Sequence, residues 1–157
     1  MLYWHWQVSQ LKFTRIKGEA RANCEMGECF MELKREERGF VTETAYGSLH
    51  VSSDEQQGFR PFQLMAASVA GCSAIVLNKV MAKMRIPCDD IKVSVQVERN
   101  EAEANRIERL QLHFVIRGQN LKKDKVERAM ALARKNCPMV QSVKNSIDVT
   151  ETFEIVE

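Results

Sequence analysis

The longest uncharged stretch of the chain is Pro61-Phe-Gln-Leu-Met-Ala-Ala-Ser-Val-Ala-Gly-Cys-Ser-Ala-Ile-Val-Leu77. It carries no charge and is apolar almost all round, which is typical of a helix that is covered on more than one side. Proline suits the first turn of a helix, because its missing N–H has no intrahelical partner there. We predict a helix from Pro61 to about Met84, stopped by Pro87. A buried helix explains this 17-residue stretch better than a membrane span.

Short strands are predicted before this helix. Residues 30–35 and 40–44 flank a turn at Gly39, which indicates a β-hairpin. A second turn at residues 45–48 leads into a strand over residues 49–52. The N-terminal part of the molecule is therefore expected to be a small antiparallel sheet.

More strands are predicted after the helix. Apolar and polar residues alternate over residues 91–97 and again over residues 110–116, which indicates two half-buried strands. The polar segment 100–105 joins them, so we expect an antiparallel pair. A last strand covers residues 147–155 and is interrupted by Glu151. Strands and helices are partly segregated, which favours an α+β fold with a largely antiparallel sheet.

A second helix is predicted near residue 124. Asp124-Lys-Val-Glu127 has the spacing of a capping box. Val126, Met130, Ala133 and Cys137 then recur at helical intervals, which places Cys137 at the end of the buried face. Pro138 ends this helix and opens a short one.

Composition narrows the class of protein. The chain has 157 residues, 28% charged and 45% hydrophobic, and a net charge of +2. This balance predicts a folded protein and gives no electrostatic case for nucleic acid or an anionic membrane. Residues 1–29 follow no clear period and are treated as an extension of uncertain order; residues 30–157 are expected to form one domain. The start lacks the pattern of a secretory signal, so a cytoplasmic location is expected.

The five cysteines are too few and too scattered for a secreted disulfide scaffold. Cys24 and Cys29 have no nearby histidine, so no metal site is predicted. In a reducing compartment, the cysteines of interest are those whose surroundings can support chemistry. Cys72 and Cys137 are the two candidates.

The thiolate is the nucleophilic form of cysteine, so each sulfur needs something that stabilises negative charge. Cys137 precedes a proline that opens a helix, where free N–H groups and the helix dipole favour an anion. Cys72 lies mid-helix among apolar residues and needs a cation from elsewhere. Arg60 is roughly 18 Å away along the helix axis at about 1.5 Å per residue, which is too far. Arg35 and Arg38 are the candidate activating cations.

Two segments together resemble the OsmC/Ohr family, the osmotically inducible and organic hydroperoxide resistance proteins. They are Arg60-Pro-Phe-Gln-Leu-Met-Ala-Ala-Ser-Val-Ala-Gly-Cys72 and, 65 residues after that cysteine, Asn136-Cys-Pro-Met-Val-Gln-Ser-Val-Lys144. The resemblance covers residues 30–157 and is to a divergent branch. It implies an intertwined homodimer in which largely antiparallel sheets pack around a long central helix that bears Cys72.

The resemblance also implies a reaction. Cys72 would attack an organic hydroperoxide, and Cys137 would capture the resulting sulfenic acid as a disulfide. A dithiol reductant, which is of the lipoyl type in the better-known branch, would reopen the disulfide. No metal or organic cofactor is implied.

The chain departs from the family pattern after Pro61. The peroxidase branches carry a Glu there that helps position the activating Arg, and this chain has Phe62 followed by Gln63. Phe62, Gln63 and Met65 are candidates for lining a substrate pocket. Two alternatives to a peroxidase stay open: a non-catalytic small-molecule binder of the same fold, and a structural dimer whose cysteines only pack the core.

Overall fold

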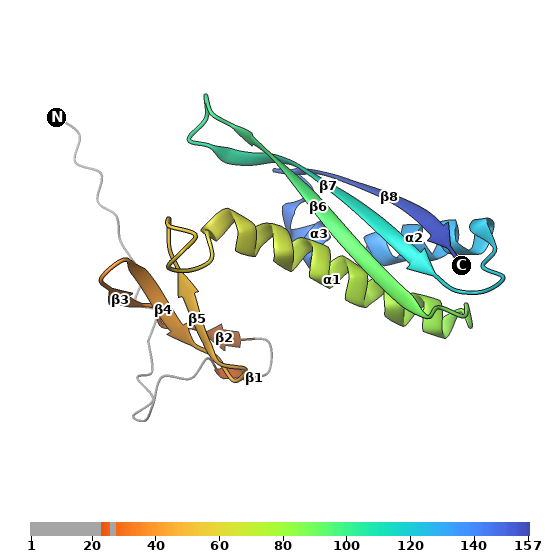
Figure 1. Ribbon diagram of the computed structural model, residues 1–157, viewed down its shortest axis with the longest axis horizontal. Helices are drawn as coiled ribbons and strands as arrows, with labels where there is room; N and C mark the ends of the chain where they lie inside the picture. The colour runs from red at the N-terminus through yellow and green to blue at the C-terminus, as the bar shows by residue number, and fades with distance from the viewer. Residues whose placement is uncertain (1–22, 26–27) are drawn as a thin grey trace.

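The structure is a computed structural model that describes residues 23–25 and 28–157 (Figure 1). Most of the predicted extension over residues 1–29 lies outside the described residues. The elements follow in the order β1 (Asn23–Glu25), β2 (Glu28–Phe30), β3 (Lys34–Glu36), β4 (Gly39–Glu43), β5 (Ser48–Val51), α1 (Pro61–Lys83), β6 (Asp90–Asn100), β7 (Arg106–Arg117), α2 (Lys123–Asn136), α3 (Pro138–Val143) and β8 (Asp148–Val156).

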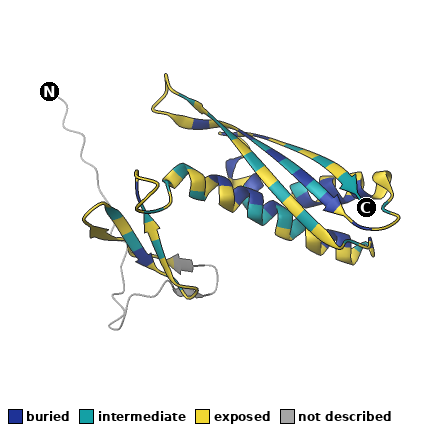
Figure 2. Cartoon of the chain, in the orientation of Figure 1, coloured by how far each residue is buried: buried dark blue, intermediate teal, exposed yellow. Residues whose placement is uncertain are grey.

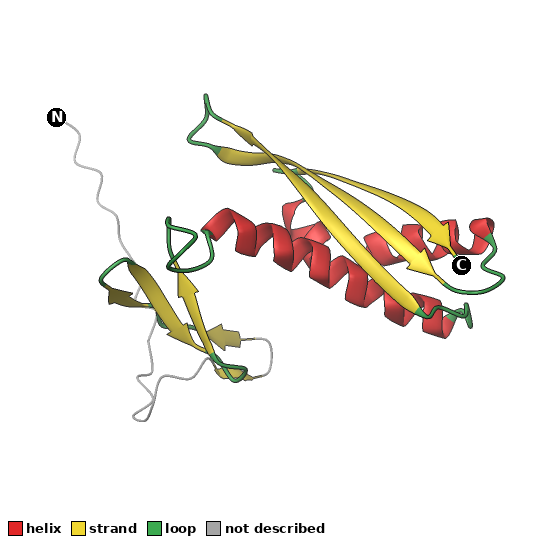
Figure 3. Ribbon diagram, in the orientation of Figure 1, coloured by secondary structure: helices red, strands yellow, loops and turns green. Residues whose placement is uncertain are grey.

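The C-terminal region, from α1 to β8, has two layers (Figure 3). A three-stranded sheet in the order β6-β7-β8 forms one layer, and α1, α2 and α3 lie on one face of it. The described buried apolar side chains all fall between Ala66 and Val149, within this region. Alternation explains the register of the strands. Leu110, Leu112, Phe114 and Ile116 of β7 are buried, and polar or half-buried residues stand between them.

Strand pairing in this sheet is mixed. β6 and β7 pair antiparallel, as predicted. β8 pairs with β7 in parallel, which was not predicted; the other pairs among the described strands are antiparallel, so the sheets are largely antiparallel as expected. The cause is the connection: α2 and α3 carry the chain back along the sheet, so β8 starts at the same end as β7. The predicted α+β class, with a long central helix, is confirmed.

The central helix α1 begins and ends as predicted. Pro61 occupies its first turn, the Gln63 side chain accepts a hydrogen bond from the Arg60 amide at 3.1 Å, and the helix ends at Lys83. Among the described residues, α1 is the one helix long and apolar enough to cross a membrane by length and composition. It packs against α2, α3 and β6, which is how a core helix is placed.

The start of α2 differs from the prediction. Its N-cap is Lys122, which makes no capping hydrogen bond through its side chain, and Asp124 lies inside the first turn. The expected capping box at Asp124 is therefore wrong. A carboxylate in the first turn still interacts favourably with the helix dipole, which explains why the acidic residue marks the right place.

The N-terminal sheet, β3-β4-β5, lies at the N-terminal end of α1 and packs on neither face of the other sheet (Figure 1). β3 and β4 form the predicted hairpin, but β3 is confined to Lys34–Glu36 and is shorter than expected. Gly39 is required at the turn, because a Cβ there would overlap the Val51 carbonyl oxygen. Few of these residues are buried (Figure 2).

Candidate functional site

The two candidate cysteines are held by different kinds of backbone. Cys72 lies in the middle of α1 and is half-buried. Cys137 is fully buried at 0% exposure and forms the joint between α2 and α3, where it ends one helix and caps the next in extended backbone conformation. α1 packs against both α2 and α3, so the two segments meet.

The folded chain brings the two thiols together. Burial of the Cys137 thiol is the largest cause that raises its pKa, and the neighbouring Cys72 thiol raises it further. The amides of Val140 and Met139 act in the opposite direction, although neither makes a regular capping hydrogen bond to the sulfur. Burial therefore outweighs the helix N-terminus that the sequence pointed to.

These surroundings give the two sulfurs different chemistry. A protonated, fully buried thiol is a poor first nucleophile for a dissolved substrate. Cys72 is the more accessible of the pair. An oxidised sulfur at Cys72 would form directly beside the Cys137 thiol.

The Pro138 joint is stabilised by a side chain. Pro138 has no N–H, so it leaves the Arg134 carbonyl without its usual helical donor. The Gln141 side chain donates to that carbonyl at 3.1 Å, and the Gln141 amide bonds the Cys137 carbonyl at 3.0 Å. The kink that carries Cys137 is thus fixed from both sides.

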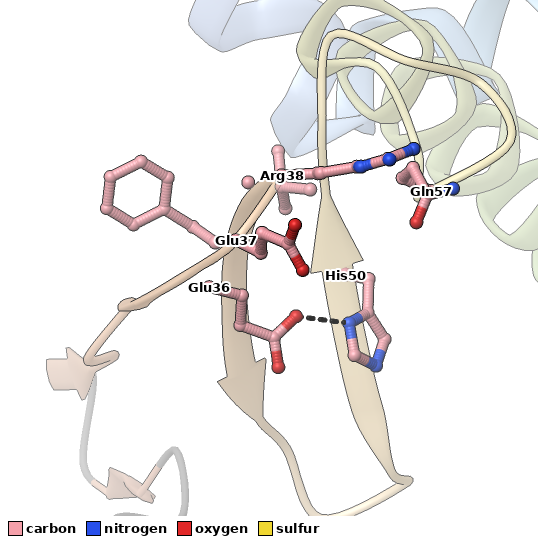
Figure 4. Close-up of a pocket in the computed structure, with 8 residues that line it drawn as sticks. Glu36, Glu37, Arg38, His50 and Gln57 are labelled. Atoms are coloured by element: carbon pink, nitrogen blue, oxygen red, sulfur yellow. Dashed lines mark hydrogen bonds and ion pairs between the residues drawn. The ribbon is translucent and has the colours of Figure 1, made fainter.

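The candidate activating cations lie elsewhere in the chain. Arg35 is on β3 and Arg38 is in the β3–β4 turn, and both are exposed in the N-terminal sheet. Figure 4 shows Arg38 extending toward Gln57 in an open hollow of about 520 Å³ that also contains the Glu36–His50 pair at 3.0 Å. That hollow contains neither cysteine. A single chain does not bring Arg35 or Arg38 to Cys72, and their role stays a prediction.

The candidate pocket residues cluster at the start of α1. Phe62 is half-buried against the core, and the guanidinium groups of Arg60 and Arg99 stand over its ring at 4.9 and 4.8 Å. Gln63 is exposed and caps the helix, as described above. Met65 is exposed one turn along. Phe62 is thus held in place by stacking and cannot supply a carboxylate at this position.

One group beside the cysteines was missed by sequence reasoning. Ser73, next to Cys72, donates to the Glu151 carboxylate at 2.6 Å, and Arg134, three residues before Cys137, pairs with the same carboxylate at 3.4 Å. The signal was present in the sequence, because Glu151 interrupts the apolar positions of the last strand. Its partners became visible only in the fold.

No group of three or more His, Cys, Asp or Glu side chains in the described part of the chain is arranged to hold a metal ion. The predicted absence of a metal stays a prediction, because Cys24 and Cys29 have no described side chains.

Comparison with known proteins identifies the family. The model of the OsmC-like protein family matches residues 52–152. The chain belongs to the OsmC-like protein family. Protein YhfA of Escherichia coli K12 is 29% identical over 121 residues, covering 74% of this chain and 90% of YhfA.

Solved structures share the OsmC-like fold. A hypothetical protein from Aquifex aeolicus VF5 superposes with a TM-score of 0.73 at 23% identity, covering 81% of this chain and 95% of that one. An organic hydroperoxide resistance protein OsmC from Legionella pneumophila gives a TM-score of 0.63 at 22% identity, over 80% and 96% of the two chains. An organic hydroperoxide resistance protein from Elizabethkingia anophelis gives 0.66 at 19%, over 81% and 96%.

Proposed function

We propose that this OsmC-like protein is a thiol-dependent peroxidase that reduces organic hydroperoxides to alcohols. The observation that carries the proposal is that the fold makes neighbours of two thiols that lie 65 residues apart in the sequence, close enough for Cys72 to affect the pKa of Cys137. Hydroperoxide resistance proteins of the same fold make organic hydroperoxides the natural substrate class to test.

The proposed reaction balances in three steps. The Cys72 thiolate attacks the outer oxygen of ROOH and the O–O bond breaks, so Cys72 becomes a sulfenic acid; the alkoxide takes up the proton that the Cys72 thiol had released and leaves as ROH. The Cys137 sulfur then attacks the Cys72 sulfur, the S–O bond breaks, and water leaves as the disulfide forms. A dithiol, for example one of the lipoyl type, returns two electrons and two protons by thiol–disulfide exchange.

The order of the two cysteines follows from their surroundings. Cys72 is accessible and acts first, whereas Cys137 is buried, and burial raises the pKa of its thiol. A buried resolving thiol is protected from peroxide until its partner has been oxidised. These different roles favour a catalytic cycle that uses both cysteines over a reaction at either thiol alone.

A homodimer would complete the site. α1 leaves an apolar face open on which Met65 and Ile75 are exposed, and a Cβ added at Gly71 would meet no atom within 4 Å. A second copy on this face would cover it. We propose that the partner's N-terminal sheet brings one of the cations, Arg35 or Arg38, toward Cys72, in the cytoplasm.

The substrate's organic group would lie along this same helix face. Met65 is exposed beside the half-buried Phe62, and both offer apolar surface to an alkyl or aryl group. Gln63 lies between them in the sequence but is engaged in capping the helix. The pocket wall would thus come from Phe62 and Met65, with Gln63 as a structural neighbour.

A second candidate function is a non-catalytic binder of small apolar molecules. The fixed Phe62 favours it, because stacking between two guanidinium groups fills the place where the peroxidase branches carry a carboxylate. In that case the thiols would touch without turning over peroxide.

Peroxide consumption separates the two functions. Purified protein is mixed with cumene hydroperoxide and a dithiol, and peroxide loss is followed for the parent, Cys72→Ser, Cys137→Ser and Cys88→Ser. Cys88 is the matched control, since it is a half-buried free thiol on the loop between α1 and β6. The peroxidase proposal predicts that the parent consumes peroxide, that Cys72→Ser abolishes this activity and that Cys88→Ser preserves it. A parent without turnover that melts at a higher temperature when an apolar ligand is added is a binder.

The Phe62→Glu variant tests the family departure. If a missing carboxylate limits the rate, this change raises turnover, and Phe62→Gln, which adds no charge, does not. A rate that stays the same in Phe62→Glu means that the cysteine pair is activated in another way.

A further inference from the structure

The candidate reaction leaves one buried charged group unexplained. Glu151 points inward from β8 at a position that its neighbours Val149 and Phe153 fill with apolar side chains. Its side chain is only 5% exposed. A buried carboxylate is costly unless charges and donors surround it, so its partners indicate what it does.

Those partners belong to the two cysteine-bearing segments. Ser73, 1% exposed, is the residue after Cys72, and its hydroxyl donates to one Glu151 oxygen at 2.6 Å. Arg134 lies one turn before Cys137, and its guanidinium pairs with the other oxygen at 3.4 Å. The same guanidinium donates to the Val149 carbonyl at 2.6 Å, which ties α2 to β8 a second time.

We propose that Glu151 is a positioning residue that holds Cys72 and Cys137 at bonding distance. Its carboxylate touches neither sulfur; it acts through Ser73 on α1 and Arg134 on α2. The inference rests on the proposed function, because it names the residue that positions the two sulfurs for the second step of that cycle, in which the disulfide forms.

The physical argument concerns the separation of the two thiols. A disulfide forms only when the two Cα atoms approach within about 4.4–6.8 Å, a narrow range for residues on different helices. α1 and α2 share an apolar interface, and apolar contacts alone tolerate sliding. The Glu151 carboxylate on β8 bonds Ser73 of α1 and Arg134 of α2, and we call these three residues the clamp. Such charged hydrogen bonds fix the relative orientation of the two helices as well as the distance between them. The Gln141 bond to the Arg134 carbonyl extends this restraint to α3, across the Pro138 joint.

The test measures how readily the Cys72–Cys137 disulfide forms when no peroxide is present. The protein is brought to equilibrium with reduced and oxidised glutathione, in which the protein dithiol and one glutathione disulfide give the protein disulfide and two glutathione thiols. Alkylation and mass spectrometry then give the fraction of Cys72–Cys137 disulfide. The equilibrium constant reports the effective concentration of one thiol at the other.

Two variants each remove one contact of the clamp. Glu151→Gln keeps the volume but loses the charge that pairs with Arg134, and Ser73→Ala removes the hydroxyl on the α1 side. We expect each to lower the equilibrium constant by roughly tenfold, within the range of coupling seen for residues in one network. The double variant should lose less than the product of the two single losses, because both changes act through one carboxylate.

Two controls separate positioning from loss of stability. Glu154→Gln makes the same change on an exposed position of β8, where the carboxylate lies 3.8 Å from His113. Val126→Ala removes buried volume from α2 away from the clamp and lowers the melting temperature. Both should leave the glutathione equilibrium as in the parent.

The outcomes are distinct. If Glu151→Gln and Ser73→Ala match the parent while the parent forms the disulfide, the clamp is wrong and the peroxidase proposal stands. If Val126→Ala lowers the constant as much as Glu151→Gln does, loss of stability explains the effect and the clamp is again wrong. A parent that forms the disulfide with glutathione but consumes no peroxide refutes the peroxidase and leaves the clamp intact. A parent that forms no Cys72–Cys137 disulfide overturns both.

Discussion

The C-terminal region and the N-terminal sheet of this chain differ in how far they bury their apolar side chains. From α1 to β8 the chain builds its own core, in which side chains such as Leu77, Phe114 and Val140 are fully buried. In β3-β4-β5 the described buried side chains within or beside the strands are the polar Thr42 and Ser52, and Phe40 and Phe59 remain exposed. One region forms an apolar core within a single chain, and the other does not.

This difference supports the proposed homodimer and indicates where a second copy would lie. A three-stranded sheet with exposed aromatic side chains and no core gains little from folding alone. The C-terminal region also leaves apolar side chains exposed, on the uncovered face of α1. Both deficits are explained if each copy's N-terminal region is covered by its partner.

The largest expected effect is on the complete core. Leu77→Ala should lower the free energy of unfolding by about 2–5 kcal/mol, because Leu77 is fully buried and a cavity would remain. Chemical denaturation measures this. Leu132→Ala, at a position on α2 that is 44% exposed, should change it by less than about 0.5 kcal/mol. Equal losses in the two variants would mean that the core is not where the structure places it.

The next effect is on assembly. Ile75 is 57% exposed on α1, so Ile75→Asp should be tolerated by a single chain but should weaken a dimer about tenfold or more, since the interface would bury an unpaired charge. Sedimentation velocity over a concentration series measures the dissociation constant. Leu132→Asp is the control on an exposed face of α2. A parent that sediments as a monomer refutes the dimer outright.

Hydrogen exchange sharpens the same contrast region by region. In the Ile75→Asp monomer, we expect amides of β4 and β5 to exchange much faster than in the parent, while amides of β7 keep their protection, because only the N-terminal sheet loses its cover. Mass spectrometry of peptic peptides gives the comparison. Uniformly faster exchange would instead indicate that both regions unfold together.

A smaller effect is expected from pH. Burial raises the pKa of the Cys137 thiol above its ordinary value of 9.0, so the folded chain holds this proton more tightly than the unfolded chain does. The resulting stability is full below pH 9 and is lost as pH rises from there through the folded pKa. Denaturation of the reduced protein from pH 7 to 10.5 should show this fall, and Cys137→Ala should reduce it. Cys88→Ser is needed as a second control, because burial also raises the pKa of Cys88.

The smallest effect is expected at the surface. Arg109 pairs with Glu98 at 2.8 Å and with Asp148 at 3.1 Å, yet all three side chains are exposed. Exposed ion pairs contribute little, because water and salt screen them. Arg109→Gln should therefore leave the melting temperature unchanged. A clear loss would place this end of the sheet inside an interface.

Most of the fold was predictable from the sequence, for local reasons. Strict alternation fixed β6 and β7, and Pro61 and Pro87 bracketed α1. The direction of β8 was not predictable, because alternation along a strand is the same whether its neighbour runs parallel or antiparallel. The Asp124 cap failed because helix ends tolerate several neighbouring starts.

The site was only half predictable. Cys72 and Cys137 could be singled out by their local surroundings, but their contact depends on how α1 packs against α2 and α3. The balance at Cys137 was misjudged, because the sequence indicated both a helix start and a buried position but not that burial would be the stronger influence on the pKa. Glu151 was visible as an irregularity, and its partners on two helices were not.

Parallel pairing of β8 with β7 also governs how the thiol pair comes together during synthesis. A parallel neighbour is reached only through a crossover, and Cys137 lies within that crossover. The ribosome must make 65 more residues after Cys72 before the partner thiol exists, which takes roughly 3–13 s at about 5–20 residues per second. An oxidant that meets the nascent chain in that interval finds Cys72 before Cys137 exists to capture its oxidised form.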